Sequence, residues 1–417
     1  MTGTRHVAVI GGGVIGLSCA HYLLDRGHRV TVVERGGPDH DCCSLGNAGF
    51  ISPSHFVPLA APGMVEKAFR WMWNPESPFY VRPRIDPEFF AWGWHFWRAS
   101  SPARVRRAEP VLRDLALASR DLFIDLAEGT GNEFGLVREG LLLLFRTEKA
   151  LEAETRVAAR CRELGMPAEV LDARGVAALE PGVTFDVIAG VKYPLDAHLV
   201  PQRLVATLTR LVKERGATFV WNTEVGGFSR DGQRVGAVVT PQGTIDADEF
   251  VLAAGSWSPQ LARRIGLRLP LEPGKGYSLT IEKPREMPRR SIILHEARVA
   301  ITPMGGALRV GGTMEFAGID LRINPPRVRG ILKSLARYLP SFRPEDFAST
   351  TPWCGLRPVT PDGLPYVGRL LKNLTIATGH AMMGVSLAPI TGKLVSEIVS
   401  GETPRIDIAA LRPDRFG

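Results

Sequence analysis

The sequence predicts an α/β protein with two domains, one built on a parallel sheet between helices and a second, α+β domain built on an antiparallel sheet. Apolar strands that run into glycine or other small residues recur at residues 6–10, 248–255 and 374–379, a pattern typical of parallel strands buried on both faces. Strand patterns separated by turn residues occur at 136–146 and 276–315 and favour an antiparallel sheet. The length of 417 residues suits two domains of ordinary size.

The N-terminal segment predicts a strand, a glycine turn and a helix. Its glycines fit GxGxxG: Gly11 makes the tight turn, Gly13 lets the backbone approach a pyrophosphate, and Gly16 lets helix and strand pack closely. The next strand, residues 29–33, ends at Glu34, 18 residues after Gly16, where a carboxylate can accept hydrogen bonds from a ribose diol. We therefore predict a Rossmann-like dinucleotide site with the phosphates at the helix N-terminus.

A second anion site is expected near the C-terminus. The strand at 374–379 runs into a glycine loop, and a helix follows over 390–399, with Pro389 in its first turn, where a missing N–H costs nothing. Such a helix N-terminus favours negative charge. Two separate anion sites suit FAD, because the first can bind the pyrophosphate and the second can stabilise the negative charge of the reduced flavin ring. NAD needs no second anion site.

Composition excludes several classes of protein. Charged residues make up 23% of the chain, which is ordinary for a globular protein and excludes a disordered or fibrous one. The net charge of +8 is spread thinly, with the densest basic cluster at 104–107, so a nucleic-acid partner is not expected. Five cysteines without a CxxC pair favour neither a disulfide framework nor a metal site. No apolar run approaches the roughly 18 residues that a membrane-spanning helix needs. Residues 1–5 lead directly into a strand and leave no room for a signal peptide. We therefore expect a cytoplasmic protein.

Several of these segments resemble a known family. They are similar in type and order to the FAD-dependent amino acid oxidoreductases related to D-amino acid oxidase, and the likeness spans essentially the whole chain. The segments that carry it are 6–16, 34–35, 43–50, 251–255, 355–365 and 379–392. The strings that look most like bacterial D-amino acid dehydrogenases are 47–49, 51–53, 60–63 and 276–280. The resemblance implies a D-amino acid oxidase-like fold and non-covalently bound FAD.

The resemblance also implies which residues contact the cofactor. Those expected on the adenosine side are Val14, Ile15, Glu34, Arg35 and Val225. Those expected along the ribityl chain and the ring are Cys43, Ser44, Ala48, Gly49 and Phe50. The small residues at a strand end that let the backbone approach the cofactor are Ala254 and Gly255. Those expected along the pyrimidine edge are His380, Met383, Gly384, Val385 and Ser386.

On the substrate side, Arg357 matches the arginine that clamps the substrate carboxylate in this family. A guanidinium fork binds a carboxylate bidentately and fixes the direction of the Cα–H bond. The implied reaction passes a hydride from Cα to flavin N5, and water then hydrolyses the imino acid to a 2-oxo acid and ammonia. Tyr277 and His55 are candidates to contact the substrate, although strand packing and a solvated loop explain them equally well. His198 and His295 are expected to be structural.

Other assignments stay open. Electrons are expected to pass to a quinone or dye-type acceptor, while a glycine or sarcosine-type oxidase and a dehydrogenase for proline or hydroxyproline are alternatives. Cys354 departs from the threonine of the dehydrogenase pattern and is expected to be a buried, apolar-like residue. Cys42 adjoins Cys43, and adjacent cysteines rarely form a disulfide.

The domain boundaries follow from the strand patterns. The FAD-binding domain is expected over 1–132, 191–258 and 351–417, with an aromatic-rich insertion at 55–100, and the substrate domain over 133–190 and 259–350. The segment 69–97 contains five of the eight tryptophans, Trp71, Trp73, Trp92, Trp94 and Trp97. We expect this segment to pack over the flavin and the substrate domain, and peripheral contact with a membrane or an electron acceptor is the alternative.

Overall fold

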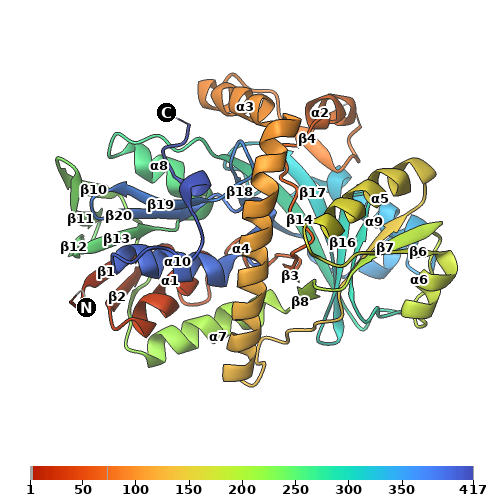
Figure 1. Ribbon diagram of the computed structural model, residues 1–417, viewed down its shortest axis with the longest axis horizontal. Coiled ribbons are helices and arrows are strands. Elements are labelled where there is room, and N and C mark those ends of the chain that lie inside the picture. Colours follow the sequence, from red (N-terminus) through yellow and green to blue (C-terminus); the bar gives the residue numbers. More distant parts are fainter. Residues whose placement is uncertain (1–2, 73, 417) are drawn as a thin grey trace.

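The computed structural model describes residues 3–72 and 74–416, and it has two large sheets with a long helix between them (Figure 1). The first sheet has the strand order β19 (Tyr366–Leu371), β20 (Leu374–Thr378), β13 (Glu249–Leu252), β1 (His6–Ile10), β2 (Arg29–Val33) and β9 (Thr218–Val220). All its strand pairs are parallel except that of the edge strand β19 with β20. The prediction of a parallel sheet is confirmed, since β1 and β13 are buried along nearly their whole length as their apolar sequences require.

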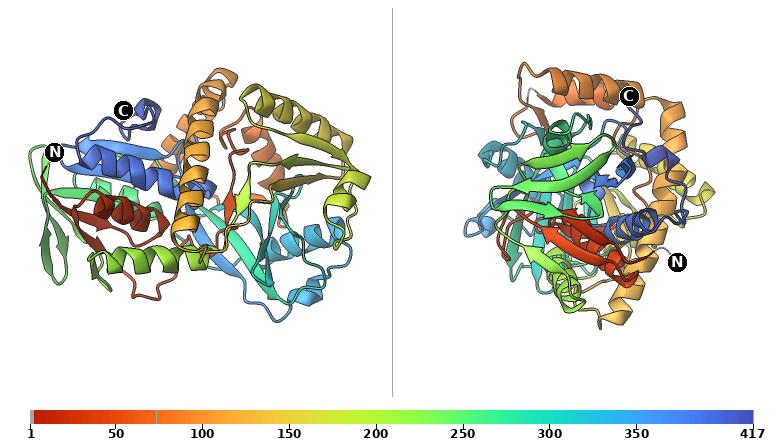
Figure 2. Two further views of the ribbon diagram at one scale, coloured as in Figure 1. Left: turned by 60° about the horizontal axis from the view of Figure 1, so that its bottom comes forward. Right: turned by 90° about the vertical axis from the view of Figure 1, so that its left-hand side faces the viewer.

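Helices and a small sheet cover the two faces of this parallel sheet. One face packs against α1 (Val14–Asp25), α7 (Pro201–Glu214) and α10 (Ala388–Val399). A Cβ atom at Gly392 would overlap the carbonyl of Ser18, so this glycine lets α10 pack closely on α1. The other face packs against α8 (Ser258–Arg263) and a three-stranded sheet of β10 (Gly227–Asp231), β11 (Arg234–Thr240) and β12 (Gly243–Asp246). Both chain termini lie on this half of the molecule (Figure 2).

The second sheet has nine strands and is mainly antiparallel. Its path is β18 (Trp353–Val359), β14 (Glu272–Glu282), β17 (Ala307–Phe316), β16 (Val299–Met304), β15 (Ser291–Leu294), β5 (Leu141–Phe145), β7 (Ala189–Tyr193) and β6 (Glu169–Asp172), with β4 (Phe79–Val81) paired to β17. The pairs β5–β15 and β4–β17 are parallel, which the antiparallel expectation did not include. One face of the sheet packs on α9 (Pro325–Tyr338) and the short 3₁₀ turn Pro344–Phe347, while α5 (Glu148–Glu163) and α6 (Ala173–Leu179) cover the far end.

Helix α4 (Pro102–Gly129) runs between the two sheets (Figure 1). Its buried residues Leu112 and Leu115 belong to one core cluster with Val7 of the first sheet and Leu141 of the second. Ser119 also donates a hydrogen bond to the carbonyl of Ser386, 2.6 Å away. The helix therefore joins the two sheets through a continuous apolar core.

The remaining short elements are β3 (Phe50–Ile51), β8 (Ala197–His198), and the 3₁₀ turns Gly255–Trp257, Ala381–Met383 and Ala409–Leu411.

The aromatic-rich segment forms α2 (Met64–Met72), β4 and α3 (Pro87–Ala99), and α3 has two different faces. On the inner face Trp92 is buried, stacks on Phe96 at 5.2 Å and donates Nε1–H to the Val359 carbonyl at 2.9 Å. On the outer face Trp94 and Trp97 are 56% and 58% exposed. The expected packing is thus found on one side of α3 only, and Trp73 lies outside the described residues.

The domain boundaries remain a prediction. Strand β18 lies within 351–417, the segment expected for the FAD-binding domain, but it pairs with β14 of the nine-stranded sheet.

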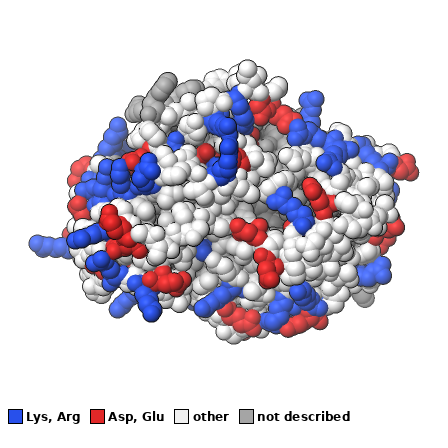
Figure 3. Space-filling model, turned by 180° about the vertical axis from the view of Figure 1, so that it is seen from behind, with Lys and Arg blue, Asp and Glu red and all other residues white. Residues whose placement is uncertain are grey.

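Within the described residues, no helix is both long and apolar enough to cross a bilayer. The surface in Figure 3 carries basic and acidic side chains side by side, as expected for a small net charge spread over a large chain.

Candidate active site

A cavity of about 780 Å³ opens between the two sheets and collects most of the residues predicted from sequence. Of the predicted residues, Gly16, Gly49 and Ser386 are absent from its lining. The predicted residues that line it are Gly11, Gly13, Val14, Ile15, Glu34, Arg35, Cys43, Ser44, Ala48, Phe50, His55, Val225, Ala254, Gly255, Tyr277, Arg357, His380, Met383, Gly384 and Val385. The volume is in the range of pockets that enclose organic ligands.

The glycine turn forms one part of the cavity wall. Gly11 has φ of +110°, and a Cβ atom on it would lie 2.5 Å from the Ala253 carbonyl oxygen, so only glycine fits there. A Cβ atom on Gly16 would overlap the Gly11 carbonyl, which explains why Gly16 shapes the turn without lining the cavity. Gly13 faces the cavity, and the N–H of Val14 donates to Ser44 Oγ at 3.2 Å. Gly13 and Ile15 line the cavity on either side of Val14, so this end of α1 faces the space where an anionic ligand would bind.

Glu34 and Trp257 mark the end of the cavity expected for adenosine. Glu34 accepts hydrogen bonds from the backbone N–H of Gly12 at 2.7 Å and of Gly36 at 2.9 Å, which fixes its carboxylate at the tip of β2. Arg35 stacks on the Trp257 ring at 3.7 Å, and both residues line the cavity. Sequence analysis did not single out Trp257, although it follows the small residues at the end of β13.

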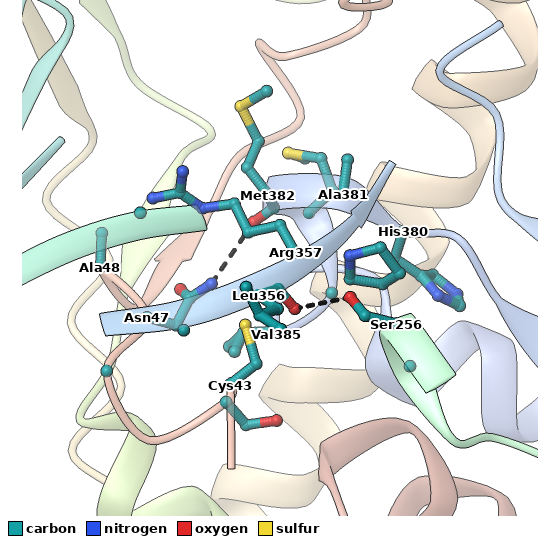
Figure 4. Close-up of a pocket in the computed structure, with 18 of the residues that line it drawn as sticks. Cys43, Asn47, Ala48, Ser256, Leu356, Arg357, His380, Ala381, Met382 and Val385 are labelled. Carbon is teal, nitrogen blue, oxygen red and sulfur yellow. Dashed lines mark hydrogen bonds between the residues drawn. The ribbon is translucent and has the colours of Figure 1, made fainter. Parts of the chain in front are cut away.

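A loop over residues 42–50 lines the cavity between the glycine turn and β17 of the second sheet. Figure 4 shows Cys43, Asn47 and Ala48 of this loop together with Met382, whose carbonyl accepts a hydrogen bond from Asn47 Nδ2 at 3.4 Å. Arg309 of β17 donates to the carbonyls of Leu45 and Asn47, each at 2.8 Å. Burial lowers the pKa of Arg309 to about 10. Sequence analysis missed Arg309, and the signal that could have found it was an arginine within a strand of mainly apolar and small residues.

His380 lies at the start of the C-terminal glycine loop. Its Nε2 is 2.9 Å from Thr391 Oγ1, and its Nδ1 is buried without a hydrogen-bond partner among the described residues. Burial lowers the pKa of His380 to about 3, so the imidazole is neutral at ordinary pH. An unpartnered buried nitrogen in a cavity wall fits a site that a polar ligand completes. Ser386 lies behind this wall and accepts a hydrogen bond from the N–H of Ser52 at 3.1 Å.

Arg357 extends from β18 over Gly276 of β14, on the cavity side of the sheet (Figure 4). Its Nη1 donates to the Thr313 carbonyl at 2.6 Å. Thr313 has φ of +72° in β17, next to a register shift opposite Gly276, and this irregular backbone aims the carbonyl at the guanidinium. Among the described residues no carboxylate pairs with Arg357. Burial lowers the pKa of Arg357, an effect that Cys43 opposes, and the group remains a cation available to an anionic ligand.

Tyr277 follows Gly276 in β14, and its side chain lies on the other face of the strand. Because successive residues of a strand point to opposite faces, Tyr277 points away from the face on which Arg357 covers Gly276. Its hydroxyl donates to Glu315 Oε2 at 2.8 Å, and burial together with Glu315 raises the pKa of Tyr277. This geometry favours strand packing for Tyr277 over contact with a substrate held by Arg357.

His55 lines the cavity beside Ser54, whose Oγ is 3.3 Å from its Nδ1. Burial and the charge of Arg298 lower the pKa of His55 to about 4, so His55 is neutral at ordinary pH.

Cys354 packs on the Tyr277 side of the sheet and donates Sγ–H to the Leu321 carbonyl at 2.9 Å.

A polar cluster that sequence analysis did not identify lies in the same cavity. Glu154 of α5 accepts a hydrogen bond from the Tyr193 hydroxyl at 2.6 Å and lies 3.6 Å from His295 Nδ1. Arg298 lines the cavity next to them. His295 was expected to be structural, and the structure instead brings it to the cavity wall. These residues come from three separate segments, so no local motif joined them.

Comparison with known proteins identifies relatives over nearly the whole chain. Residues 6–398 match the DAO family model, described as FAD dependent oxidoreductase. The chain is 37% identical to a D-amino acid dehydrogenase of Granulibacter bethesdensis, covering 98% of this chain and 99% of that protein. It is 39% identical to a D-amino acid dehydrogenase of Methylobacterium radiotolerans, covering 96% and 97%. The glycine oxidase structure from Geobacillus kaustophilus superposes with a TM-score of 0.79 at 27% identity, covering 99% of each chain.

Proposed function

This chain belongs to the DAO family of FAD-dependent oxidoreductases, and from this we propose that it converts D-amino acids to 2-oxo acids and ammonia, as a D-amino acid dehydrogenase. FAD is the cofactor of the family. The cavity fits it, because the glycine turn leaves the α1 N-terminus open, Glu34 is fixed at the tip of β2, and His380 offers an unpartnered Nδ1.

The observation that carries the proposal is the guanidinium of Arg357, which lines the cavity without a carboxylate partner among the described residues. A carboxylate held on this fork is oriented by two parallel hydrogen bonds, and the Cα attached to it then has a fixed direction. The Thr313 carbonyl holds Nη1 and limits the rotation of the fork.

The chain's own residues bind and orient the substrate, while bound FAD supplies the acceptor for two electrons and the Cα hydrogen. Both His55 and His380 are neutral at ordinary pH because burial lowers the pKa of each. Neither imidazole therefore adds a positive charge to the cavity in the free protein.

The test is to mix the FAD-loaded protein with D-alanine, D-proline and their L-forms without oxygen and to follow the flavin absorbance. Bleaching by a D-amino acid is expected, and no bleaching by any D-form would overturn the proposal. Preference for D-proline would instead favour a dehydrogenase of cyclic amino acids. Oxygen consumption with glycine or sarcosine would favour the oxidase alternative, which the likeness to glycine oxidase keeps relevant.

We also propose that electrons leave to a quinone or dye-type acceptor and that the protein contacts the membrane peripherally from the cytoplasmic side. The support is the outer face of α3, where Phe90, Trp94 and Trp97 are 61%, 56% and 58% exposed and the two tryptophan rings stack at 5.2 Å. Exposed basic residues follow directly in the chain, namely Arg98, Arg104, Arg106 and Arg107. Exposed aromatic rings beside basic side chains suit an anionic bilayer surface.

A further inference from the structure

Arg298, in the turn between β15 and β16, also lines the cavity. It has φ of +55°, and its N–H donates to the His295 carbonyl at 3.3 Å. Its own carbonyl lies 3.0 Å from the Cβ position of Gly312, the residue before Thr313. The Thr313 carbonyl accepts from Arg357 of β18, which crosses β14 to reach it. The backbone of Arg298 and the guanidinium of Arg357 therefore approach adjacent residues of β17 from its two sides.

The Arg298 guanidinium has no direct partner among the residues that the structure describes. Its side chain is exposed to the cavity and forms no hydrogen bond or ion pair with the residues that the structure describes. Partial loss of hydration in the cavity lowers the pKa of Arg298, and the charges of Glu154 and Glu296 oppose this effect without a direct contact. A guanidinium has five N–H donors, so the whole fork remains free for a ligand.

The carboxylates near Arg298 are already engaged elsewhere. Glu154 accepts from the Tyr193 hydroxyl and lies beside His295. Glu296 accepts from the backbone N–H groups of Arg146 and Thr147 and from the Tyr338 hydroxyl. The apolar side chains in this region of the wall, Leu143, Val157 and Ile293, weaken the screening of the free charge.

We propose that Arg298 binds a second carboxylate, carried by the substrate side chain, so that acidic D-amino acids such as D-glutamate and D-aspartate are the preferred substrates. This inference rests on the proposed function, because Arg357 must take the α-carboxylate. A basic side chain would meet the positive charge of Arg298 and a Glu154 carboxylate that already has partners, whereas an acidic one meets a free guanidinium.

The test compares D-glutamate with D-glutamine, which has nearly the same shape without the charge. The wild-type protein is expected to favour D-glutamate in kcat/KM by about tenfold or more. Arg298→Gln is expected to lower kcat/KM for D-glutamate by about 100-fold and to leave D-glutamine within about threefold. Arg289→Gln, at an exposed position outside the cavity lining, is the matched control and should change neither value.

A binding measurement separates this inference from the proposed function. Glutarate and pentanoate differ by one carboxylate, and their binding to the FAD-loaded protein can be titrated through the flavin spectrum. Tighter binding of glutarate, lost in Arg298→Gln, supports the second carboxylate site even if no D-amino acid bleaches the flavin, a result that would overturn only the proposed function. Equal binding of the two acids, or an equal loss for D-glutamate and D-glutamine in the variant, would overturn the role given to Arg298.

Discussion

Gly276 lies directly beneath the guanidinium of Arg357, so closely that a Cβ atom on Gly276 would overlap Cζ and both terminal nitrogens. Gly276 pairs with Gly355 across β14 and β18, and Arg357 is two residues further along β18. The arginine thus crosses the neighbouring strand and reaches the Thr313 carbonyl of the strand beyond it. The missing side chain at position 276 creates the space through which a strand residue reaches the cavity.

Gly276→Ala is therefore expected to displace Arg357 and to lower kcat/KM for the preferred D-amino acid by about 100-fold, the usual effect of an ångström-scale misplacement. Steady-state kinetics measure this value, and circular dichroism checks that the fold is kept. Gly182→Ala is the control, because a Cβ atom there meets nothing within 4 Å. Unchanged kinetics in Gly276→Ala would show that the position of Arg357 does not matter.

Arg357→Met keeps the length of the side chain and removes the fork. We expect a steep rise in KM and a loss in kcat/KM equivalent to about 2–5 kcal/mol, because the substrate carboxylate loses its partner in a partly dry cavity. Arg156→Met on the exposed surface of α5 should leave both constants unchanged. An unchanged kcat/KM in Arg357→Met would remove Arg357 from the substrate site.

Glu34→Gln replaces one acceptor oxygen with an NH₂ group that cannot accept from the backbone N–H of Gly12 or Gly36. One buried N–H loses its partner, which costs about 1–3 kcal/mol and loosens the tip of β2. FAD affinity, measured by quenching of flavin fluorescence, should fall accordingly. Glu282→Gln, at an exposed position on β14, is expected to retain wild-type affinity, and equal affinity in both variants would contradict a role for Glu34 in the cofactor site.

The buried carboxyl of Asp196 is expected to make the free energy of unfolding depend on pH. It accepts from the N–H of Ser54 at 3.0 Å and from its hydroxyl at 2.6 Å, yet burial raises the pKa of Asp196 to about 7. The unfolded carboxyl ionises near pH 4, so between about pH 4 and pH 7 the folded state retains a proton that the unfolded state has lost. This contribution to stability is complete below about pH 4 and declines by about 1.4 kcal/mol per pH unit as the pH rises to about 7.

Asp196→Asn does not ionise and should remove that decline from the free energy of unfolding, measured in denaturant at a series of pH values. Asp231→Asn, at an exposed position, is the control and should keep the wild-type slope. The same slope in wild type and Asp196→Asn would mean that Asp196 is ionised in the folded protein.

The outer face of α3 predicts binding to anionic vesicles. Replacing both Trp94 and Trp97 by serine removes two half-exposed rings, and co-sedimentation with such vesicles at low salt should fall at least about fivefold. Val170→Ser removes an apolar residue with 44% exposure on β6 and should have no effect. No binding of the wild-type protein at low salt would contradict the membrane contact.

Local features of the sequence were sufficient to predict the parallel sheet and the glycine turn with Glu34. The strand over residues 6–10, the glycine turn and Glu34 lie within one βαβ unit, where spacing alone fixes their relation, and the parallel sheet was predicted correctly from such units. The position of Glu34 follows from the same spacing, since both its backbone partners lie within this unit or next to it.

The residues that line the substrate side of the cavity could be identified only from the tertiary structure. The pairing of β14 with β18 and β17 places the Arg357 guanidinium and the Tyr277 ring on opposite faces of the sheet, which no local pattern in the sequence indicates. Arg298 and Arg309 flank β16, whereas Glu154 is far from both in the chain. All three line one cavity because α5 packs on the nine-stranded sheet. Register between distant strands depends on long-range packing, and a shift of one residue would reverse every side chain, so no local pattern could have assigned these residues to the site.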